Sequence, residues 1–283
     1  MPPTSPAPVP LTDHWTIARN HPIFYRAAPG QPGNLPIIHL HGFGISGRYL
    51  VPTAARLARW YPTYVPDLPG YGRSPRPEGV LDIPDLATEV VGFMDALGLD
   101  RAVLLGNSLG CIVAIEVANL VPDRIPRAIL VSPSGGTHNE PLPRGLAQLA
   151  FDGLHEGPRM TGIAIRDYLK FGLANSVRLF RAMTAYDISA HLDPLQLPLL
   201  VVAGTRDPLV SIPQLEETVL RHANMVLAIQ DGAAHALNFT HPHALTHTVR
   251  AWLEDRPMIP ATPVPNGHAL LLDGAPGADM TTQ

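Results

Sequence analysis

Short apolar segments alternate with longer segments of helical periodicity along most of the chain. Runs such as Ala102–Asn107 and Leu199–Gly204 are almost entirely apolar, which is typical of strands buried on both faces. Between such runs, Arg48–Trp60 and Pro84–Leu97 carry apolar residues on one helical face. Because alternating strands and helices pack as a parallel sheet between two helical layers, the sequence predicts an α/β fold with a mostly parallel central sheet.

The predicted elements extend from about residue 11 to residue 255. Two segments separated by Asn20-His21 are predicted to pair as a hairpin before the alternation begins. The predicted strands are His14–Arg19, Ile23–Ala27, Ile37–His41, Thr63–Asp67, Ala102–Asn107, Ala128–Ser132, Leu199–Gly204 and Val226–Ile229. The helices predicted around them are Arg48–Trp60, Pro84–Leu97, Leu109–Leu120 and His243–Leu253.

Residues 134–192 do not follow this alternation. They contain three segments of helical periodicity, at Gly145–Phe151, Arg159–Phe171 and Val177–Tyr186. Connections of this length inside a compact domain are usually functional, so we expect a helical lid inserted into a core of residues 11–133 and 193–256. Proline is concentrated in residues 1–10 and 257–283, which are predicted to be extended or disordered tails.

The composition narrows the possible functions. Of the 283 residues, 46% are hydrophobic and 16% are charged, so the chain can bury a core and is not wholly disordered. A net charge of −4 gives no basic surface for nucleic acid, and a single cysteine excludes internal disulfides and multi-cysteine zinc sites. No apolar run approaches the roughly 20 residues of a membrane span, and the amino terminus lacks the pattern of a secretion signal. We therefore expect a cytoplasmic protein that acts on a small molecule, without a nucleic-acid or membrane partner.

The sequence Gly-Asn-Ser-Leu-Gly occupies residues 106–110, where an apolar strand meets an apolar helix. A serine at such a junction sits on a sharp turn, and the flanking glycines let strand and helix pass closely. The turn would raise Ser108 Oγ above the sheet edge and direct the Leu109 N–H toward a developing oxyanion. The pattern predicts Ser108 as a nucleophile; the alternative is a serine in an ordinary strand-to-helix loop.

Together with four further motifs, this junction gives the chain a family resemblance over nearly its whole body. The motifs, in chain order, are His41-Gly42-Phe43-Gly44, Asp67–Ser74, Gly106–Gly110, Gly204–Leu209 and Gly232–His235. They resemble those of the alpha/beta-hydrolase family, in particular its serine esterase and C–C hydrolase members. The resemblance implies the alpha/beta-hydrolase fold with an inserted lid, and a triad in the chain order Ser, Asp, His.

A serine hydroxyl needs a neighbouring base at neutral pH. His235 lies in the loop after the last predicted strand, and this loop returns to the same edge of the sheet as Ser108. The chain order Ser, Asp, His of the family implies that His235 is the base. Asp207 is predicted to accept a hydrogen bond from His235 Nδ1, with Asp231 as the competing carboxylate. With an ordinary histidine as base, kcat/KM would fall on the acid side through a pKa near about 6.5.

Other groups are predicted to support this chemistry. The N–H groups of Phe43 and Leu109 should form the oxyanion hole, whereas His41 is predicted to be structural. Five large lid side chains are candidates for lining a substrate pocket, although helical stripes of this kind more often pack a lid onto its body. They are Tyr168, Phe171, Phe180, Met183 and Tyr186.

Several conspicuous residues are predicted to have no chemical role. His243 and His247 share a helix face, but Ala244 stands where a helical zinc motif would have glutamate, so no metal is predicted there. No other cofactor is predicted either. Cys111 lies on the apolar helix after Ser108 and is expected to be buried and inert. The turn Asp67–Ser74 is expected to be hydrogen-bonded internally.

Acyl transfer to water through an acyl-enzyme is the reaction that these groups favour, with a small-molecule carboxylic ester as substrate. Cleavage of a C–C bond in a vinylogous diketone, of a lactone or of a thioester remains open. The oxyanion loop of the C–C hydrolases usually resembles His-Gly-x-Gly-Pro-Gly, whereas Ile45-Ser46 follows Gly44 here. The non-enzymatic alternative is a small-molecule receptor on the same fold. The sequence indicates neither the physiological substrate nor the oligomeric state.

Overall fold

The structure is a computed structural model in which residues 7–79, 81–134, 144–145, 148, 151–152, 156–256, 262–263 and 269–272 are described. Its strands are β1 (Thr12–Ala18), β2 (His21–Ala28), β3 (Ile37–Leu40), β4 (Thr63–Pro66), β5 (Val103–Asn107), β6 (Ala128–Val131), β7 (Leu199–Gly204), β8 (Met225–Gln230), β9 (Thr262–Pro263) and β10 (Ala269–Leu272).

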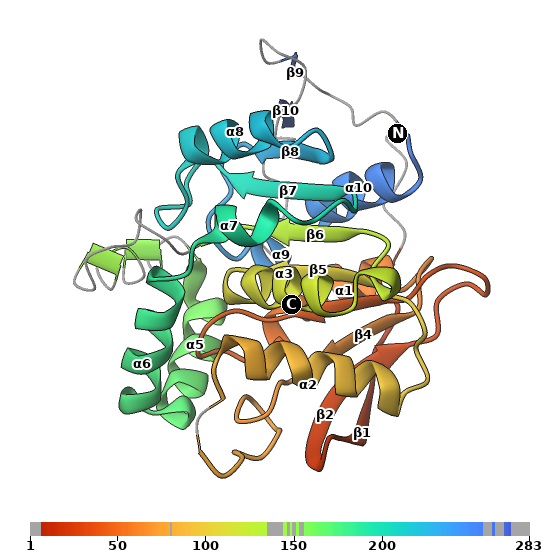
Figure 1. Ribbon diagram of the computed structural model, residues 1–283, viewed down its shortest axis with the longest axis vertical. Helices are drawn as coiled ribbons and strands as arrows, with labels where there is room; N and C mark the ends of the chain where they lie inside the picture. The colour runs from red at the N-terminus through yellow and green to blue at the C-terminus, as the bar shows by residue number, and fades with distance from the viewer. Residues whose placement is uncertain are drawn as a thin grey trace.

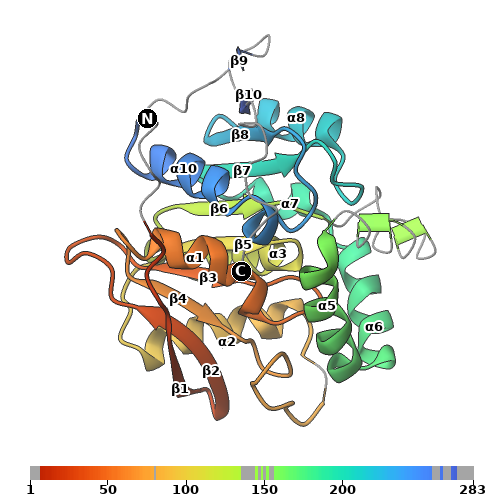
Figure 2. The same cartoon turned by 180° about the vertical axis from the view of Figure 1, so that it is seen from behind.

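These described strands form one sheet in the order β1-β2-β4-β3-β5-β6-β7-β8-β10-β9 (Figures 1 and 2). Neighbours from β4 through to β10 run parallel, whereas β1, β2 and β4 pair antiparallel, as do β9 and β10. The mostly parallel sheet predicted from the sequence is therefore confirmed, and the antiparallel pairs lie at its two edges.

Helices cover both faces of the sheet (Figures 1 and 2). Alternate residues of each strand point to opposite faces, so Leu104 joins one core while Val103 and Leu105 join the other. The body helices are α1 (Val51–Leu57), α2 (Ile83–Ala96), α3 (Leu109–Leu120), α8 (Ile212–Arg221), α9 (Leu237–Thr240) and α10 (Pro242–Leu253). Short 3-10 helices lie at Gly47–Leu50 and Pro122–Arg124.

The helices on both sides of the sheet bury the faces on which the sequence places their apolar residues. In α2, Leu86, Val90 and Phe93 contact the core that contains Leu104, and α10 buries its own apolar face in the opposite core. The amino terminus of α2 is fixed by Asp82, whose side chain accepts the backbone N–H of Asp85 while Asp85 accepts that of Asp82. The body is thus a three-layer sandwich of helices, sheet and helices.

The lid contains α5 (Gly157–Phe171) and α6 (Leu173–Thr184), and α7 (Ile188–Leu192) leads back to β7. Figure 1 shows α5 and α6 beyond the carboxyl ends of β6 and β7. The ring of Phe43, in the loop after β3, contacts the rings of Tyr168 on α5 and Phe180 on α6, with centroid distances of 5.8 and 5.7 Å. These contacts place the lid over the end of the sheet where strand-following loops meet.

Some elements differ from the predicted ones. The β1–β2 turn is one residue earlier than predicted, with Ala18 paired to His21. Helix α8 was not predicted. The strands β9 and β10 lie within residues 257–283, which were predicted to be a tail, and β10 pairs in parallel with β8. Most of the predicted helix Gly145–Phe151 lies outside the described residues. Within the described part of the chain, no helix combines the length and the hydropathy that crossing a membrane requires.

Candidate active site

Ser108 lies on a strained turn between β5 and α3. Its φ and ψ angles are 56° and −121°, a conformation that non-glycine residues rarely adopt. A Cβ atom on Gly106 would clash with the backbone of Gly110, and one on Gly110 would clash with the carbonyl of Leu40. No side chain fits at either position, so the two glycines are what allow strand and helix to hold Ser108 in this position.

The loops after β7 and β8 bring Asp207 and His235 together. His235 Nδ1 lies 2.8 Å from Asp207 Oδ2, and both residues are buried. The other carboxylate oxygen, Oδ1, accepts the Leu209 N–H at 2.9 Å, which fixes the orientation of the carboxylate. The competing Asp231 instead accepts a hydrogen bond from the Thr205 hydroxyl at the surface. The geometry therefore pairs His235 with Asp207.

Ser108 and His235 both line a cavity of about 120 Å³ beneath the lid. Ser108 Oγ lies 2.9 Å from Ser134 Oγ, which also lines the cavity and was not singled out in the sequence. The cavity walls are otherwise largely apolar, with side chains from the lid and from residues 41–46, the loop after β3 that the sequence predicts to be the oxyanion loop. The structure thus places Ser108 and His235 on one cavity that a small molecule could occupy.

The environment of His235 alters its proton affinity. Burial lowers its pKa, but the charge of Asp207 and the hydrogen bond to it outweigh this effect. With further contributions from Asp152 and Glu156, they raise the pKa of His235 to about 9. The pKa near about 6.5 expected from the sequence assumed an ordinary histidine and is corrected here, because the imidazolium faces buried carboxylates.

This shift predicts a displaced pH profile. Because only neutral imidazole can accept a proton, its fraction falls about tenfold per pH unit below its pKa. We therefore expect kcat/KM for p-nitrophenyl butyrate to rise with pH up to about 9. Initial rates at closely spaced pH values, corrected for spontaneous ester hydrolysis, measure the profile. A plateau already reached at about pH 7.5 would contradict the raised pKa of His235, because it is the profile of a base that titrates near about 6.5.

The oxyanion loop is held by a hydrogen-bond chain that the sequence did not reveal. Gly42 N–H donates to Tyr49 Oη at 2.9 Å, and Tyr49 O–H donates to Asn107 Oδ1 at 2.5 Å. Asn107 Nδ2 in turn donates to the carbonyl of His235 at 3.2 Å. Asn107 precedes Ser108, so the two buried side chains of Tyr49 and Asn107 connect Gly42, the serine turn and the histidine loop. This chain fixes the relative positions of three segments of the site.

The comparisons with known proteins identify the family of this chain. A family model described as the alpha/beta hydrolase family matches residues 37–248, which include all the segments above. The chain belongs to the alpha/beta hydrolase family. The resemblance and the fold expected from the sequence motifs are thereby confirmed.

Relatives of this alpha/beta hydrolase include an esterase and a lactone-degrading enzyme. Polyketide synthase ThaQ from Burkholderia thailandensis is 30% identical over 77% of the chain, which spans only 12% of that protein. The pimeloyl-[acyl-carrier protein] methyl ester esterase of Pectobacterium carotovorum subsp. carotovorum is 28% identical over 78% of the chain and 95% of the esterase. Among solved structures, Est816, an N-acyl homoserine lactone degrading enzyme, has a TM-score of 0.69 at 25% identity, over 84% of this chain and 100% of Est816.

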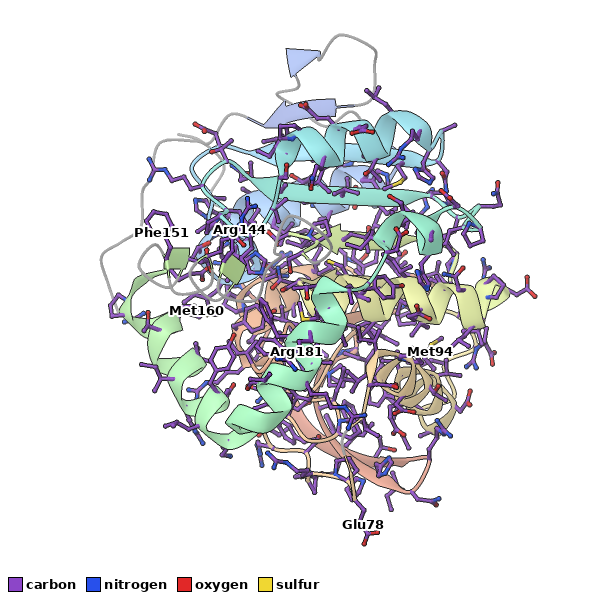
Figure 3. All side chains as sticks on the ribbon, turned by 60° about the vertical axis from the view of Figure 1, so that its left-hand side comes forward. Glu78, Met94, Arg144, Phe151, Met160 and Arg181 are labelled. Carbon is purple, nitrogen blue, oxygen red and sulfur yellow. The ribbon has the colours of Figure 1, made fainter. Side chains whose placement is uncertain are left out.

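The five lid side chains proposed from the sequence divide into two groups. Tyr168, Phe180 and Met183 line the cavity of the hydrolase. Phe171 instead stacks on Tyr71, and the Tyr186 hydroxyl donates to Glu116, so neither of these two lies on the cavity wall. Met160, labelled in Figure 3 at the start of α5, lines the cavity and was missed, because its helical stripe gives no sign of which side faces substrate.

His41 has the structural contacts expected of it. Its Nε2 accepts the Leu68 N–H at 3.0 Å, so Nδ1 carries the proton and faces the Gly42 carbonyl at 3.1 Å. Burial lowers the pKa of His41, which favours this neutral form. The ring therefore connects the oxyanion loop to the turn after β4.

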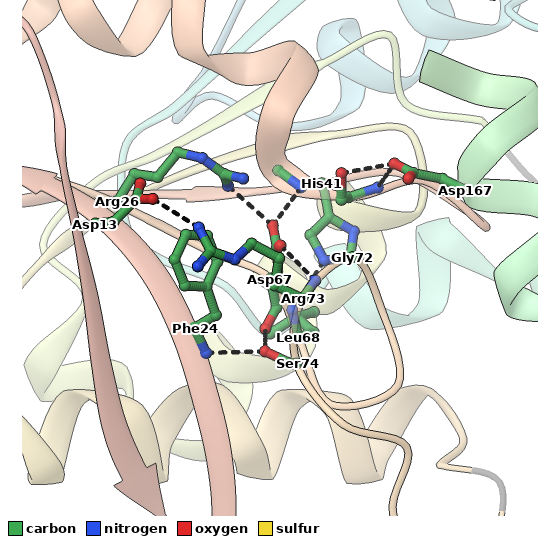
Figure 4. Close-up of polar contacts among 12 residues, drawn as sticks. Asp13, Phe24, Arg26, His41, Asp67, Leu68, Gly72, Arg73, Ser74 and Asp167 are labelled. Atoms are coloured by element: carbon green, nitrogen blue, oxygen red, sulfur yellow. Dashed lines mark hydrogen bonds and ion pairs between the residues drawn. The ribbon is translucent and has the colours of Figure 1, made fainter. Parts of the chain in front are cut away.

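That turn is organised around Asp67 (Figure 4). Its carboxylate accepts the backbone N–H groups of Gly47 and Arg73, each at 2.9 Å, and pairs with Arg26 at 3.1 Å. The Ser74 hydroxyl donates to the Asp67 carbonyl and accepts the Phe24 N–H. The expected internal hydrogen bonds are present, and further hydrogen bonds connect the turn to β2 and to the 3-10 helix Gly47–Leu50.

The other residues that the sequence singled out, Cys111 and His243, do not line the cavity. Cys111 is buried, its thiol faces the carbonyls of Gly106 and Val131, and burial raises its pKa. His243 Nε2 contacts the Arg56 guanidinium at 2.7 Å. Across the described residues, no three His, Cys, Asp or Glu side chains gather in a way that could hold a metal ion.

Two carboxyl groups of the lid were missed entirely. Asp152 and Glu156 line the cavity beside His235 and are only 5% and 6% exposed. They lie about eighty residues before His235 in the sequence. Only the fold of the lid brings these two carboxyl groups close to His235, so no local sequence motif could have revealed them.

Proposed function

We propose that this hydrolase cleaves a small-molecule carboxylic ester through an acyl-enzyme formed on Ser108. The observation that carries the proposal is the buried hydrogen bond between Asp207 and His235, whose ring lines the same cavity as Ser108 on its strained turn. Buried, oriented titratable groups of this kind mark sites of proton transfer. The methyl ester esterase among the relatives supports an ester as the substrate.

In the proposed mechanism, Ser108 Oγ attacks the ester carbonyl while its proton passes to His235 Nε2. Asp207 stabilises the imidazolium through the hydrogen bond to Nδ1. The tetrahedral oxyanion accepts hydrogen bonds from the N–H groups of Phe43 and Leu109, and each such donor typically contributes about 2.7–4 kcal/mol. His235 then gives its proton to the leaving alcohol, and water releases the acid by the same steps in reverse.

Covalent labelling tests the nucleophile directly. We expect a fluorophosphonate to react with one equivalent of protein, and mass spectrometry of the peptides to locate the phosphonyl group on Ser108. Labelling should abolish hydrolysis of p-nitrophenyl butyrate in proportion to occupancy. Labelling of another residue, or full activity after labelling of Ser108, would refute the proposed mechanism.

Lactone hydrolysis is the second candidate, and it is favoured by the similarity to Est816. A lactone is a cyclic ester, so the same groups would open it, with the alcohol remaining attached to the acyl chain. Rates with an N-acyl homoserine lactone and with its open-chain ethyl ester would decide which substrate the cavity prefers.

A further inference from the structure

One carboxylate of the lid is hydrogen-bonded to the oxyanion loop. Asp167 lies on α5, and its Oδ2 accepts both the backbone N–H of Ser46 at 2.8 Å and the Ser46 hydroxyl at 2.6 Å (Figure 4). Both residues are buried, and they are 121 positions apart in the sequence. Hydrogen bonds to a carboxylate are stronger than those between neutral groups, and burial shields them from competing water. Asp167 therefore connects the lid to residues 41–46.

The next residue of α5 packs against the same loop. The ring of Tyr168 contacts the ring of Phe43, and a Cβ atom on Gly44 would overlap the Tyr168 ring. The missing side chain of Gly44 is thus what lets α5 approach the loop so closely. Since hydrogen bonds and close packing act on the same few residues, a shift of α5 would move this part of the loop with it.

The segment that contacts the lid includes the proposed oxyanion donor. The body of the protein anchors the loop at Gly42 and, one residue beyond its end, at Gly47, through the hydrogen bonds given above. The lid anchors it at Ser46, and Phe43 lies between these points. A Cβ atom added to Gly42 would lie 3.2 Å from Ser108 Cβ, so the loop passes directly against the nucleophile. Because hydrogen bonds weaken steeply with distance and angle, a small displacement of the loop changes how well the Phe43 N–H can stabilise an oxyanion.

We propose that Asp167 is a positioning residue, which makes stabilisation of the oxyanion by the Phe43 N–H depend on the position of α5. This inference rests on the proposed ester hydrolysis at Ser108. Asp167 is not among the described residues that line the cavity, so it acts through the loop and not on the substrate. Without its two hydrogen bonds, the Phe43 N–H no longer points at the place where the oxyanion forms. The loss affects the transition state more than substrate binding, since charge develops on the carbonyl oxygen only during the reaction.

Asp167→Ala tests this role. We expect kcat for p-nitrophenyl butyrate to fall by about 10- to 100-fold, because complete removal of one oxyanion donor typically costs about 10²- to 10³-fold. KM should change by less than about threefold, as expected when an interaction made only in the transition state is weakened. Asp167→Asn should restore most of the activity, since an amide oxygen can accept both hydrogen bonds from Ser46.

Ser46→Ala tests the same contact from the side of the loop. The variant loses the hydroxyl but keeps the backbone N–H that donates to Asp167, so its kcat should fall less than that of Asp167→Ala. When the two substitutions are combined, we expect no further loss beyond that of Asp167→Ala alone. Such non-additivity is the mark of two residues that act through one interaction.

Asp187→Ala is the matched control for a loss of stability. Asp187 is also a carboxylate that accepts a backbone N–H, that of Ala190 at 3.2 Å, but its side chain caps α7. Removal of a helix cap lowers stability, so this variant should have a lower melting temperature and an unchanged kcat. All rates are measured well below the melting temperatures of the variants.

A trifluoromethyl ketone with a propyl chain reports on the oxyanion hole directly. Ser108 Oγ adds to its carbonyl carbon, the hydroxyl proton passes to His235, and the carbonyl oxygen becomes the oxyanion of a hemiketal. We expect its inhibition constant to rise in Asp167→Ala by about the factor by which kcat/KM falls, and to stay the same in Asp187→Ala.

The outcomes separate the positioning role from the proposed function. A kcat for Asp167→Ala equal to that of Asp187→Ala, or a loss that appears only in KM, would overturn the positioning role and leave the proposed function intact. An unchanged inhibition constant of the ketone in Asp167→Ala would overturn it as well. Failure of the unmodified protein to hydrolyse any ester would reject the proposed function and, with it, the positioning role.

Discussion

Replacement of Ser108 by alanine is expected to reduce kcat for p-nitrophenyl butyrate by about 10⁴- to 10⁶-fold. The variant lacks the atom that forms the acyl-enzyme, so only oxyanion stabilisation and binding could still act. KM should change little, because the hydroxyl contributes little to ground-state binding. Initial rates and the melting temperature of the variant measure the effect and confirm that the protein remains folded.

Ser134→Ala is the matched control for this change. Ser134 Oγ lies 2.9 Å from Ser108 Oγ on the same cavity, so both variants remove one hydroxyl from one hydrogen bond. Ser134 is not held on a strained turn between glycines and has no role in the proposed proton transfer. We expect its loss to reduce kcat by less than about tenfold. The reverse order of effects would show that Ser108 is not the nucleophile.

The core of the fold was predictable because its signals are local. Helix α3 and strand β7 have the same bounds as the predicted elements, Leu109–Leu120 and Leu199–Gly204. Both segments are predominantly apolar, and a change to polar, proline or glycine residues near their ends marks their bounds. The candidate residues in the loops after these strands could also be predicted. Parallel strands bring the loops that follow them to one edge of the sheet, so locating the strands also locates these loops.

The errors arose where composition or long-range contact decides the structure. Helix α8 has buried or half-buried apolar residues at 212, 215 and 219, a helical spacing that the sequence displays but that was not used. The tail prediction rested on proline content, whereas β10 is formed by pairing with β8, which is far away in the sequence. The hydrogen bonds of Glu156 with Ala236 and of Tyr49 with Asn107 also join distant segments, and no periodicity indicates them.

Replacement of Asp207 by asparagine is expected to lower kcat by about 10⁴-fold while preserving the fold, and the hydrogen bonds explain why. The Leu209 N–H donates to Oδ1, so the oxygen of the new amide must stay on that side and its nitrogen must face His235. That nitrogen donates to Nδ1, which forces the histidine proton onto Nε2. Nε2 then cannot accept the proton of Ser108, and the base is lost.

Asp231→Asn provides the control, because Asp231 precedes the same loop but contacts only the surface hydroxyl of Thr205 among the described residues. It should keep nearly full activity. The Asp207 variant should also lose the displaced pH profile, since the charge that raises the pKa of His235 is gone. Any residual activity of the Asp207 variant should therefore no longer rise toward about pH 9. This result is expected if the Asp207 carboxylate raises the proton affinity of His235 in the unmodified protein. Equal losses in the two variants would mean that Asp207 does not orient the base.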